Sequence, residues 1–335
     1  MKIIQTMTRK KKLRVFEAFA GYGSQAMALE RLKAHDQSFD FEVVGISEIF
    51  DKAVDVYNHI HGETKNYGDI SRIEWDKVPD FDLFTYSFPC QDLSTMGKQC
   101  GFDEGSGTRS SLLWECKKAI EAKRPKFLML ENVKAILSKK NEANLRKWLG
   151  LLESYGYSNY SKVLNALDYG VPQARQRAFV ISILEEHKPF EFPKPIPLKK
   201  TLSDIMEKNV PQRYWKIRDK NGDYDRKRIN EMVADGTIDF SKPQFISLYN
   251  WAANDRYAFT LRATETWDFF LTDNGGLRIP TERERFRLMG VDDNTIDKIL
   301  SHNLGFTKYN AMAGNSIVVD VLFYLFKEMF TLMRW

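Results

Sequence analysis

Short apolar runs alternate with longer segments of helical periodicity in the first half of the chain. Most of the runs contain β-branched or aromatic residues, which is typical of buried strands. In the segments between them, apolar residues recur every three or four positions, as on one face of a helix. We expect strands at residues 15–20, 43–48, 81–86, 127–130, 160–164 and 178–183, and helices at residues 25–33, 110–122 and 141–155. This alternation favours an open α/β sheet.

The pattern changes after residue 184. Pro189, Pro193, Pro195 and Pro197 break regular structure. The region beyond them mixes basic and aromatic residues without a clean period. That mixture suits a nucleic-acid partner, whose phosphates bind basic side chains. An irregular β-rich domain with ordinary surface charge would explain it equally well.

The last part of the chain predicts two helices. Residues 281–290 should form one, with Thr281 and Glu284 as a capping box, and residues 317–329 a strongly apolar one. An apolar helix packs against a sheet, so the chain should return to its first domain. We therefore expect a catalytic and cofactor-binding domain over residues 1–184, completed by the C-terminal helical segment 306–335, and a smaller irregular domain with its supporting helix over residues 185–305.

Composition adds few constraints. The chain has 335 residues, and 50 Lys and Arg against 45 Asp and Glu give a net charge of +5, which permits a polyanionic partner without requiring one. No apolar run is long enough to span a membrane, and no signal peptide follows the basic start, so we expect a cytoplasmic protein. The 3 cysteines lack metal-ligand spacing and no histidine pair supplements them, so no metal site is expected.

Two reactive groups follow expected strands. Cys90, in Ser87-Phe88-Pro89-Cys90-Gln91, comes just after residues 81–86, and Glu131 directly follows the run 127–130. Ligands collect at the carboxyl edge of an open α/β sheet, and a thiolate there is a strong nucleophile. Burial at a strand end would raise the pKa of Glu131, so that it could donate a proton at neutral pH. The alternatives are a small buried cysteine and an acid at a helix N-terminus.

A glycine turn, Gly21-Tyr22-Gly23-Ser24, joins the first strand to the first helix. Such a turn opens a nucleotide-binding βαβ unit, although the third glycine of a dinucleotide site is missing. Glu48, at the end of the second strand, stands where an acid commonly binds ribose hydroxyls. Asp69 could approach an adenine ring.

Basic residues accompany the two reactive groups. Arg175 and Arg177 alternate, so an extended chain would point both to one face, where a guanidinium can hold a carbonyl oxygen or a carboxylate. Residues 92–109 form a long segment rich in Gly, Ser and Thr, which predicts a lid beside the nucleophile. Lys98 and Arg109 within it could contact phosphates.

In this order the segments resemble the cytosine-C5 DNA methyltransferases of bacterial and phage restriction-modification systems, almost from end to end. The specific signals are Pro89-Cys90-Gln91, Glu131-Asn132-Val133 and the two arginines after Gln173. Glu282 departs from the family, which usually has proline there, and the departure concerns only the start of a helix. The resemblance implies a Rossmann-like, S-adenosylmethionine-dependent methyltransferase sheet with a target-recognition domain.

The resemblance also implies residue roles. Cys90 would attack C6 of a flipped-out cytosine, Glu131 would act at N3, and Arg177 would hold O2. The full catalytic set is Cys90, Glu131, Arg177, Arg175, Asn132 and Pro89. The cofactor, which leaves as S-adenosylhomocysteine, would contact Phe19, Gly21, Tyr22, Gly23, Ser24, Gln25, Glu48, Ile49, Asp69, Ile70, Asn315 and Ser316. DNA would contact Gln91, Ser94, Lys98, Arg109 and Arg262.

Partners and rival functions follow from the same resemblance. The expected substrate is double-stranded DNA, bound by a monomer. The sequence leaves open whether a restriction endonuclease accompanies the enzyme; such an endonuclease would act on the same site without direct binding. One alternative is methylation of cytosine in transfer RNA, which the long region after Glu185 disfavours. A catalytically inactive DNA-binding regulator is a second alternative. A nicotinamide oxidoreductase is a third, disfavoured by the incomplete glycine fingerprint.

Overall fold

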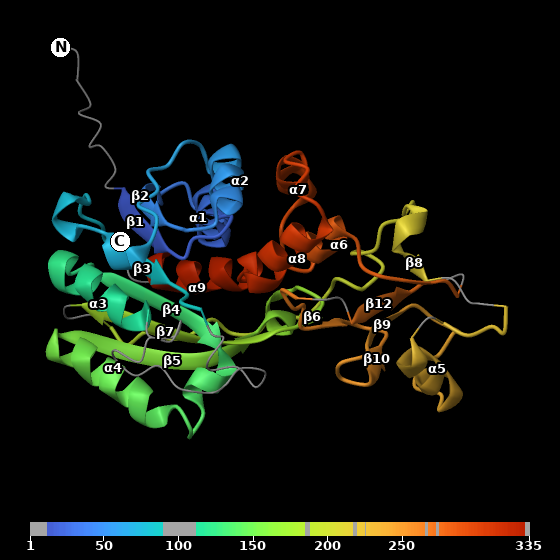
Figure 1. Cartoon of the computed structure of the whole chain (residues 1–335). Coiled ribbons are helices and arrows are strands. Elements are labelled where there is room, and N and C mark those ends of the chain that lie inside the picture. Colours follow the sequence, from blue (N-terminus) through green and yellow to red (C-terminus); the bar gives the residue numbers. More distant parts are fainter. Residues whose placement is uncertain are drawn as a thin grey trace, which may run out of the picture.

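The computed structural model describes residues 12–89, 112–184, 188–216, 220–224, 226–264, 267–272 and 275–331. Its larger unit contains a six-stranded sheet of order β2-β1-β3-β4-β7-β5 (Figure 1). The first four strands in that order are parallel, and β7 runs antiparallel to both of its neighbours. The strands are β1 (Leu13–Ala18), β2 (Phe41–Ser47), β3 (Leu83–Tyr86), β4 (Phe127–Val133), β5 (Tyr157–Asn165) and β7 (Gln176–Leu184). All six predicted strands are thus present, with shifted ends.

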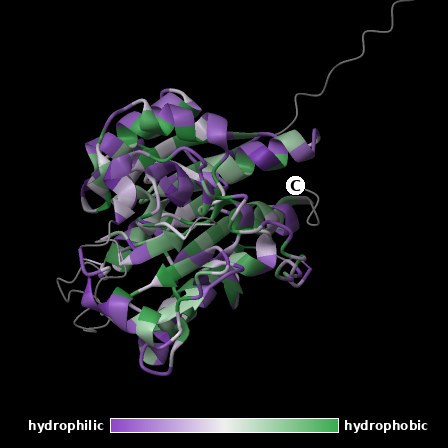
Figure 2. Cartoon of the chain, turned by 90° about the vertical axis from the view of Figure 1, so that its right-hand side faces the viewer, coloured by the Kyte–Doolittle hydropathy of each residue, from purple (hydrophilic) through white to green (hydrophobic). Residues whose placement is uncertain are grey.

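Alternation along the strands assigns side chains to two cores. In β4, Phe127 and Met129 belong to the core shared with α1 and α9, whereas Leu128 and Leu130 belong to the core shared with α3 and α4. In Figure 2 the hydrophobic positions gather along the strands. The helices of this unit are α1 (Ser24–His35), α2 (Asp51–His61), α3 (Leu112–Lys123), α4 (Glu142–Ser154), α8 (Phe306–Asn315) and α9 (Val319–Thr331).

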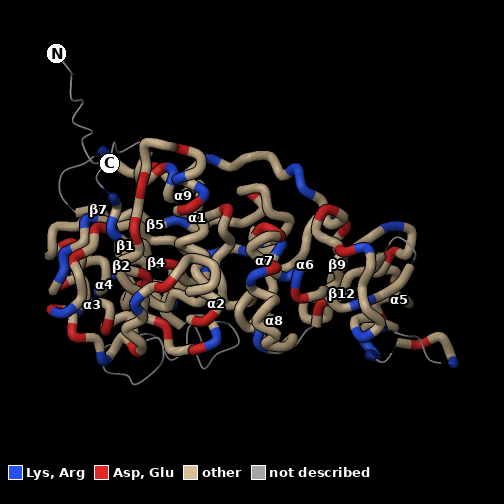
Figure 3. Tube along the Cα trace, turned by 90° about the horizontal axis from the view of Figure 1, so that it is seen from above, with Lys and Arg blue, Asp and Glu red and all other residues tan. Residues whose placement is uncertain are grey.

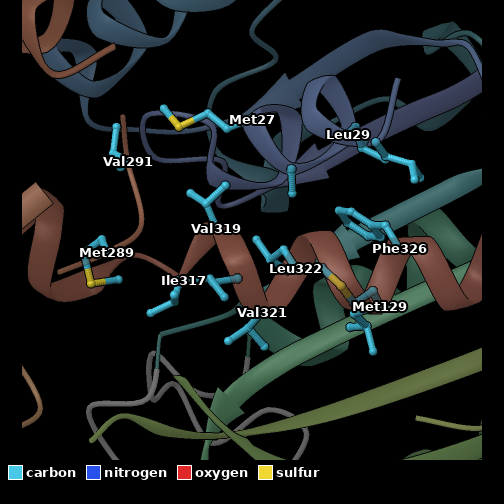
Figure 4. Close-up of a cluster of buried hydrophobic side chains, with 14 of the residues drawn as sticks. Met27, Leu29, Met129, Met289, Val291, Ile317, Val319, Val321, Leu322 and Phe326 are labelled. Carbon is cyan, nitrogen blue, oxygen red and sulfur yellow. The ribbon is translucent and has the colours of Figure 1, made fainter. Parts of the chain in front are cut away.

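The C-terminal segment contains one helix more than predicted. The helix expected at residues 317–329 is α9, and α8 precedes it, separated from it where Ser316 adopts an extended conformation. The periodicity hides α8 because its buried face includes Asn310 and Gly314, which carry no apolar side chain. Figure 4 shows α9 packed between α1 and β4, where Leu322 and Phe326 belong to the same core as Met129. The predicted return of the chain to its first unit is confirmed.

A second sheet lies beyond this unit and was not predicted as such. Its order is β10-β9-β12-β13-β8, and all its pairings are antiparallel. The strands are too short for periodicity to reveal: β8 (Trp215–Lys216), β9 (Gln244–Ser247), β10 (Ala252–Asn254), β12 (Asp268–Leu271) and β13 (Leu277–Arg278). The helix α5 (Lys227–Ala234) packs Ile229 and Met232 against the sheet. Figure 3 shows that both charge signs are mixed over both units.

Short elements connect the two sheets. The strand β6 (Gln173–Ala174) pairs in parallel with β11 (Ala258–Phe259), and α6 (Glu282–Arg287) and α7 (Asp293–Leu300) lead back to α8. The Thr281 capping box is confirmed, although α6 ends before Gly290. Glu282, at the first position of α6, accepts a hydrogen bond from the Tyr214 hydroxyl. Short 3₁₀ helices complete the described elements: η1 (Ile70–Arg72), η2 (Trp75–Lys77), η4 (Lys134–Leu137), η5 (Ala166–Tyr169) and η6 (Gln212–Tyr214).

One strand pairing bears directly on the site. Tyr86 pairs with Leu130, so the carboxyl ends of β3 and β4 meet at one edge of the sheet, as predicted.

Across the described residues, none of the helices combines the length and the apolar character that crossing a bilayer requires.

Candidate active site

A cavity of about 650 Å³ opens where the parallel strands end. It is bounded by the segments that follow β1, β2 and β3, by the end of β4 and by the end of α8. Most of the residues that the sequence singled out come together there: Phe19, Gly21, Tyr22, Ser24, Gln25, Glu48, Ile49, Asp69, Ile70, Pro89, Glu131, Asn132, Arg175, Arg177, Asn315 and Ser316. Cys90, Gln91, Ser94, Lys98 and Arg109 lie outside the described residues.

The glycine turn (residues 21–24) forms one wall. The Gly21 amide donates a hydrogen bond of 2.9 Å to the Glu48 carboxylate, whose other oxygen accepts from the amides of Ile49 and Phe50. The predicted strand-end acid is therefore fixed against the predicted turn. Gly23 is absent from the cavity wall and faces α2 instead. On the other side, the Ser24 hydroxyl contacts the Ser316 hydroxyl, which joins the turn to the C-terminal segment.

The wall beyond Glu48 is apolar between two acids. The Ile49 side chain is 76% exposed, and Phe50 beside it is also exposed. Asp69 accepts hydrogen bonds from the amide and the hydroxyl of Ser71, and these bonds hold the pKa of its carboxyl below the usual range. An exposed apolar pair flanked by carboxylates fits a nucleoside, whose flat ring needs an apolar surface and whose hydroxyls need acceptors. These residues therefore fit the nucleoside part of S-adenosylmethionine.

Glu131 lines the cavity from the end of β4, which two strands separate from β2 and Glu48, and it is only 7% exposed. Burial raises the pKa of its carboxyl, while Arg177, Arg175 and the Ser87 hydroxyl oppose that rise without cancelling it. The pKa shift that the sequence predicted, and its cause, thus agree with the structure. Asn132 donates a hydrogen bond of 3.0 Å to the Phe88 carbonyl, which ties the end of β4 to the segment that follows β3.

Arg175 and Arg177 both reach the cavity but make different contacts. The Arg177 side chain pairs with Glu131. Arg175 is buried and donates to three backbone carbonyls, those of Leu261 at 2.9 Å, Gly314 at 2.8 Å and Ser316 at 2.7 Å. Arg175 therefore joins the cavity to the second unit and to the end of α8.

Several wall residues were missed in the sequence. Phe50 could have been found as an aromatic residue that directly extends the strand-end pair Glu48-Ile49. Ser87 is the first residue of the predicted catalytic segment, but no role was assigned to it. Met312 carried no usable signal because α8 itself was not predicted, whereas Gly314 directly precedes the predicted cofactor residues Asn315 and Ser316.

Arg262 lies away from the cavity wall. Its guanidinium is 4.1 Å from the centroid of the Tyr249 ring and 3.6 Å from the buried Asp268 carboxylate. Tyr249 and Trp251 belong to the aromatic turn (residues 248–251) between β9 and β10, and they are 47% and 45% exposed. Arg228 stacks on Trp251 at 4.7 Å and donates to the Leu248 carbonyl. The turn thus presents two exposed rings, each against an arginine.

Metal-ligating groups were also sought. Across the parts of the chain that the structure describes, no three or more His, Cys, Asp or Glu side chains gather in a way that could hold a metal ion.

Comparisons with known proteins agree with one another. Residues 13–331 match the model of the C-5 cytosine-specific DNA methylases. The type II methyltransferase M2.ScrFI of Lactococcus lactis subsp. cremoris is 38% identical, over 95% of this chain and 99% of that protein. The orphan methyltransferase M.SssI of Spiroplasma monobiae is 33% identical, over 94% and 96%. The solved Entamoeba histolytica methyltransferase EhMeth shares the fold, with a TM-score of 0.74 at 17% identity over 97% of this chain and 100% of that one.

Proposed function

Because this chain belongs to the C-5 cytosine-specific DNA methylase family, we propose that it transfers a methyl group from S-adenosylmethionine to C5 of cytosine in double-stranded DNA. The observation that carries the proposal is the content of one cavity. Its wall holds both a buried acid paired with an arginine and a glycine turn bonded to Glu48. A methyl donor and a target base would therefore meet in a single site.

S-Adenosylmethionine supplies an electrophilic methyl group when it is bound. Glu48 would accept hydrogen bonds from the ribose hydroxyls, Asp69 would approach the adenine edge, and Ile49 would pack on the ring. Phe19, Ile70 and the wall residues of the glycine turn would complete the nucleoside site. Asn315 and Ser316, which bring α8 to the cavity, would lie at the methionine part. Gly23 would contribute through the shape of the turn.

The base would be activated through a covalent bond to the protein. The Cys90 thiolate would add to C6 of cytosine, and the electrons of the C5–C6 bond would move toward N3. Glu131, whose pKa burial raises, would in its protonated form donate that proton or a hydrogen bond to N3. After C5 has taken the methyl group, solvent water would accept the C5 proton. The electrons of the C5–H bond would then restore the C5–C6 double bond as the C6–S bond breaks and releases the Cys90 thiolate.

The remaining catalytic residues would hold the base. Arg177 would bind the cytosine O2, and Asn132 and Pro89 would shape the pocket beside the amino group. Arg175 would support the site through its three carbonyl contacts. A base stacked in a duplex cannot enter this cavity, so the cytosine must flip out, at a cost of a few kcal/mol.

The second unit would read the DNA. We propose the domain boundaries expected from the sequence, with residues 185–305 as the target-recognition domain and its supporting helix. Rings that stack on arginines suit a polyanion that carries flat bases, so the aromatic turn and Arg262 would face the duplex. Gln91, Ser94, Lys98 and Arg109 would add contacts from the segment after Pro89. The enzyme would act as a monomer in the cytoplasm, and any restriction endonuclease of the same specificity would act without binding it.

The test is transfer of labelled methyl groups to duplex DNA and, in parallel, to transfer RNA. Label in the DNA alone is expected, and bisulfite sequencing of DNA from expressing cells should place it at cytosine in one sequence context. Cys90→Ala should abolish the transfer while DNA binding is largely kept. Unchanged turnover in that variant, or label in transfer RNA alone, would reject the proposal.

A further inference from the structure

The helix α2 reaches two sides of the glycine turn. Glu48, Ile49 and Phe50 directly precede its first residue and line the cavity, where the Glu48 carboxylate accepts the Gly21 amide. Ala53, in the first turns of α2, also lines the cavity. Residues spaced by four lie on one helix face, so the Ala53 face continues through Tyr57 to His61.

This face of α2 packs against the back of the turn. A Cβ atom placed on Gly23 would lie 2.7 Å from Cδ2 of His61 and 2.8 Å from Cε2 of Tyr57, which is closer than real Cβ atoms pack. The two rings contact each other, with centroids 4.7 Å apart. Gly23 has a φ of 87°, a conformation that a residue with a side chain adopts at a cost. The turn therefore lies between the cavity and the two rings.

Polar groups extend the contact on both sides. The buried Nε2 edge of His61 faces the backbone of Tyr22 and Gly23. Burial lowers the pKa of His61 to about 4, so the ring is neutral at ordinary pH. The Tyr57 hydroxyl faces the Glu17 carboxyl of β1, which also faces the Ala26 amide in the first turn of α1. Glu17, Tyr57 and His61 thus form a buried row that connects β1 to the turn.

We propose that Tyr57 and His61 are positioning residues for the methyl donor, which hold the glycine turn in the shape that binds S-adenosylmethionine. Neither side chain lines the cavity, so both act through the backbone of Tyr22 and Gly23. The inference rests on the proposed function for the identity of the ligand. It concerns affinity for the donor and leaves the chemistry at the base to other residues.

The test measures binding of S-adenosylhomocysteine by calorimetry, which needs no catalysis, beside binding of a non-specific DNA duplex. His61→Ala is expected to weaken the binding of S-adenosylhomocysteine at least tenfold and to change the affinity for DNA less than twofold. In methylation assays, KM for S-adenosylmethionine should rise while kcat at saturation stays close to that of the unmodified protein. Tyr57→Phe should weaken the binding of S-adenosylhomocysteine severalfold. His59→Ala, an exposed histidine on the same helix, serves as the control and should leave both affinities unchanged.

Several outcomes would overturn the inference. One is parental affinity for S-adenosylhomocysteine in both His61→Ala and Tyr57→Phe. Another is parallel loss of both affinities with a lower melting temperature, which would indicate a general structural role. If His61→Ala does not fold, His61→Gln takes its place under the same criteria. Failure of the unmodified protein to bind S-adenosylhomocysteine would instead count against the proposed function, so the two failures are distinguishable.

Discussion

The Arg177 Nε atom lies 3.3 Å from the Glu131 Oε1 atom, and both side chains are largely buried. The pairing of β4 with β7 creates this contact. Val133 is directly opposite Arg177, and Glu131, two residues before Val133, lies on the same face of β4 and diagonally across from the arginine. Two influences on Glu131 therefore compete. Burial raises the pKa of the carboxyl and the arginine lowers it, with a net rise. The site thus places a carboxyl group with a raised pKa beside a permanent cation, which suits the proposed role of Glu131 at a cytosine ring that gains negative charge during attack.

Replacing Glu131 with Gln should slow methyl transfer by about 10²–10⁴-fold, the usual contribution of a general acid. The affinity for S-adenosylhomocysteine should change little, because the residues proposed to hold its nucleoside part belong to other segments of the cavity wall. Single-turnover transfer and calorimetry measure the two effects. The exposed Glu142, changed to Gln, is a matched control. Equal losses of rate and affinity would show that Glu131 has a structural role.

Removing the charge of Arg177 should alter the pH dependence of the reaction. Since the arginine lowers the pKa of Glu131, Arg177→Ala should raise that pKa further. Glu131 would then stay protonated to higher pH, so the alkaline limb of the kcat profile should move upward while kcat itself falls. Arg177→Lys keeps the charge and should move the limb less. A limb that stays in place, or moves to lower pH, would contradict the proposed role of Glu131.

Glu17 should make stability depend on pH. Burial raises its pKa from 4.5 to about 8 in the folded protein, so the folded state holds a proton that the unfolded chain has released. The contribution of that proton to the free energy of unfolding is fully present below pH 4.5. It falls by about 1.4 kcal/mol per pH unit as the pH rises from there to about 8.

Urea denaturation of the parent and of Glu17→Gln, at pH 5 and at pH 8, tests this expectation. The parent should lose up to about 4 kcal/mol more between the two pH values than the variant, because only Glu17 differs between them. Equal losses in the two proteins would contradict a raised pKa for Glu17.

The larger sheet and most of the cavity were predictable because each signal was local. Residues 127–130 and Glu131 needed only a buried apolar run and the acid that follows it. Gly23 was assigned to the cofactor because it belongs to a glycine turn, but the direction in which it faces depends on Tyr57 and His61, which are distant in sequence. The second sheet and α8 escaped prediction because short strands and a helix with a polar buried face leave no hydrophobic period.

The aromatic turn should contribute to DNA binding. Arg228→Ala removes a cation from beside Trp251, so it should weaken binding to any duplex. The slope of log K against the logarithm of the salt concentration should become shallower by the equivalent of about one phosphate contact. Fluorescence anisotropy at several salt concentrations measures both effects. Lys77→Ala removes the same charge from the first unit and should leave the slope unchanged. An unchanged slope in Arg228→Ala would place the duplex elsewhere.

The contact between Ser24 and Ser316 has a consequence for biosynthesis. During translation the glycine turn leaves the ribosome before α8 and α9, since Ser24 and Ser316 are 292 residues apart in the sequence. A nascent chain therefore exposes the face of α1 and β4 that α9 will later cover, and the wall of the cavity stays incomplete until α8 and Ser316 have been synthesised. Premature termination anywhere before α9 would consequently yield a polypeptide that is both inactive and prone to aggregate.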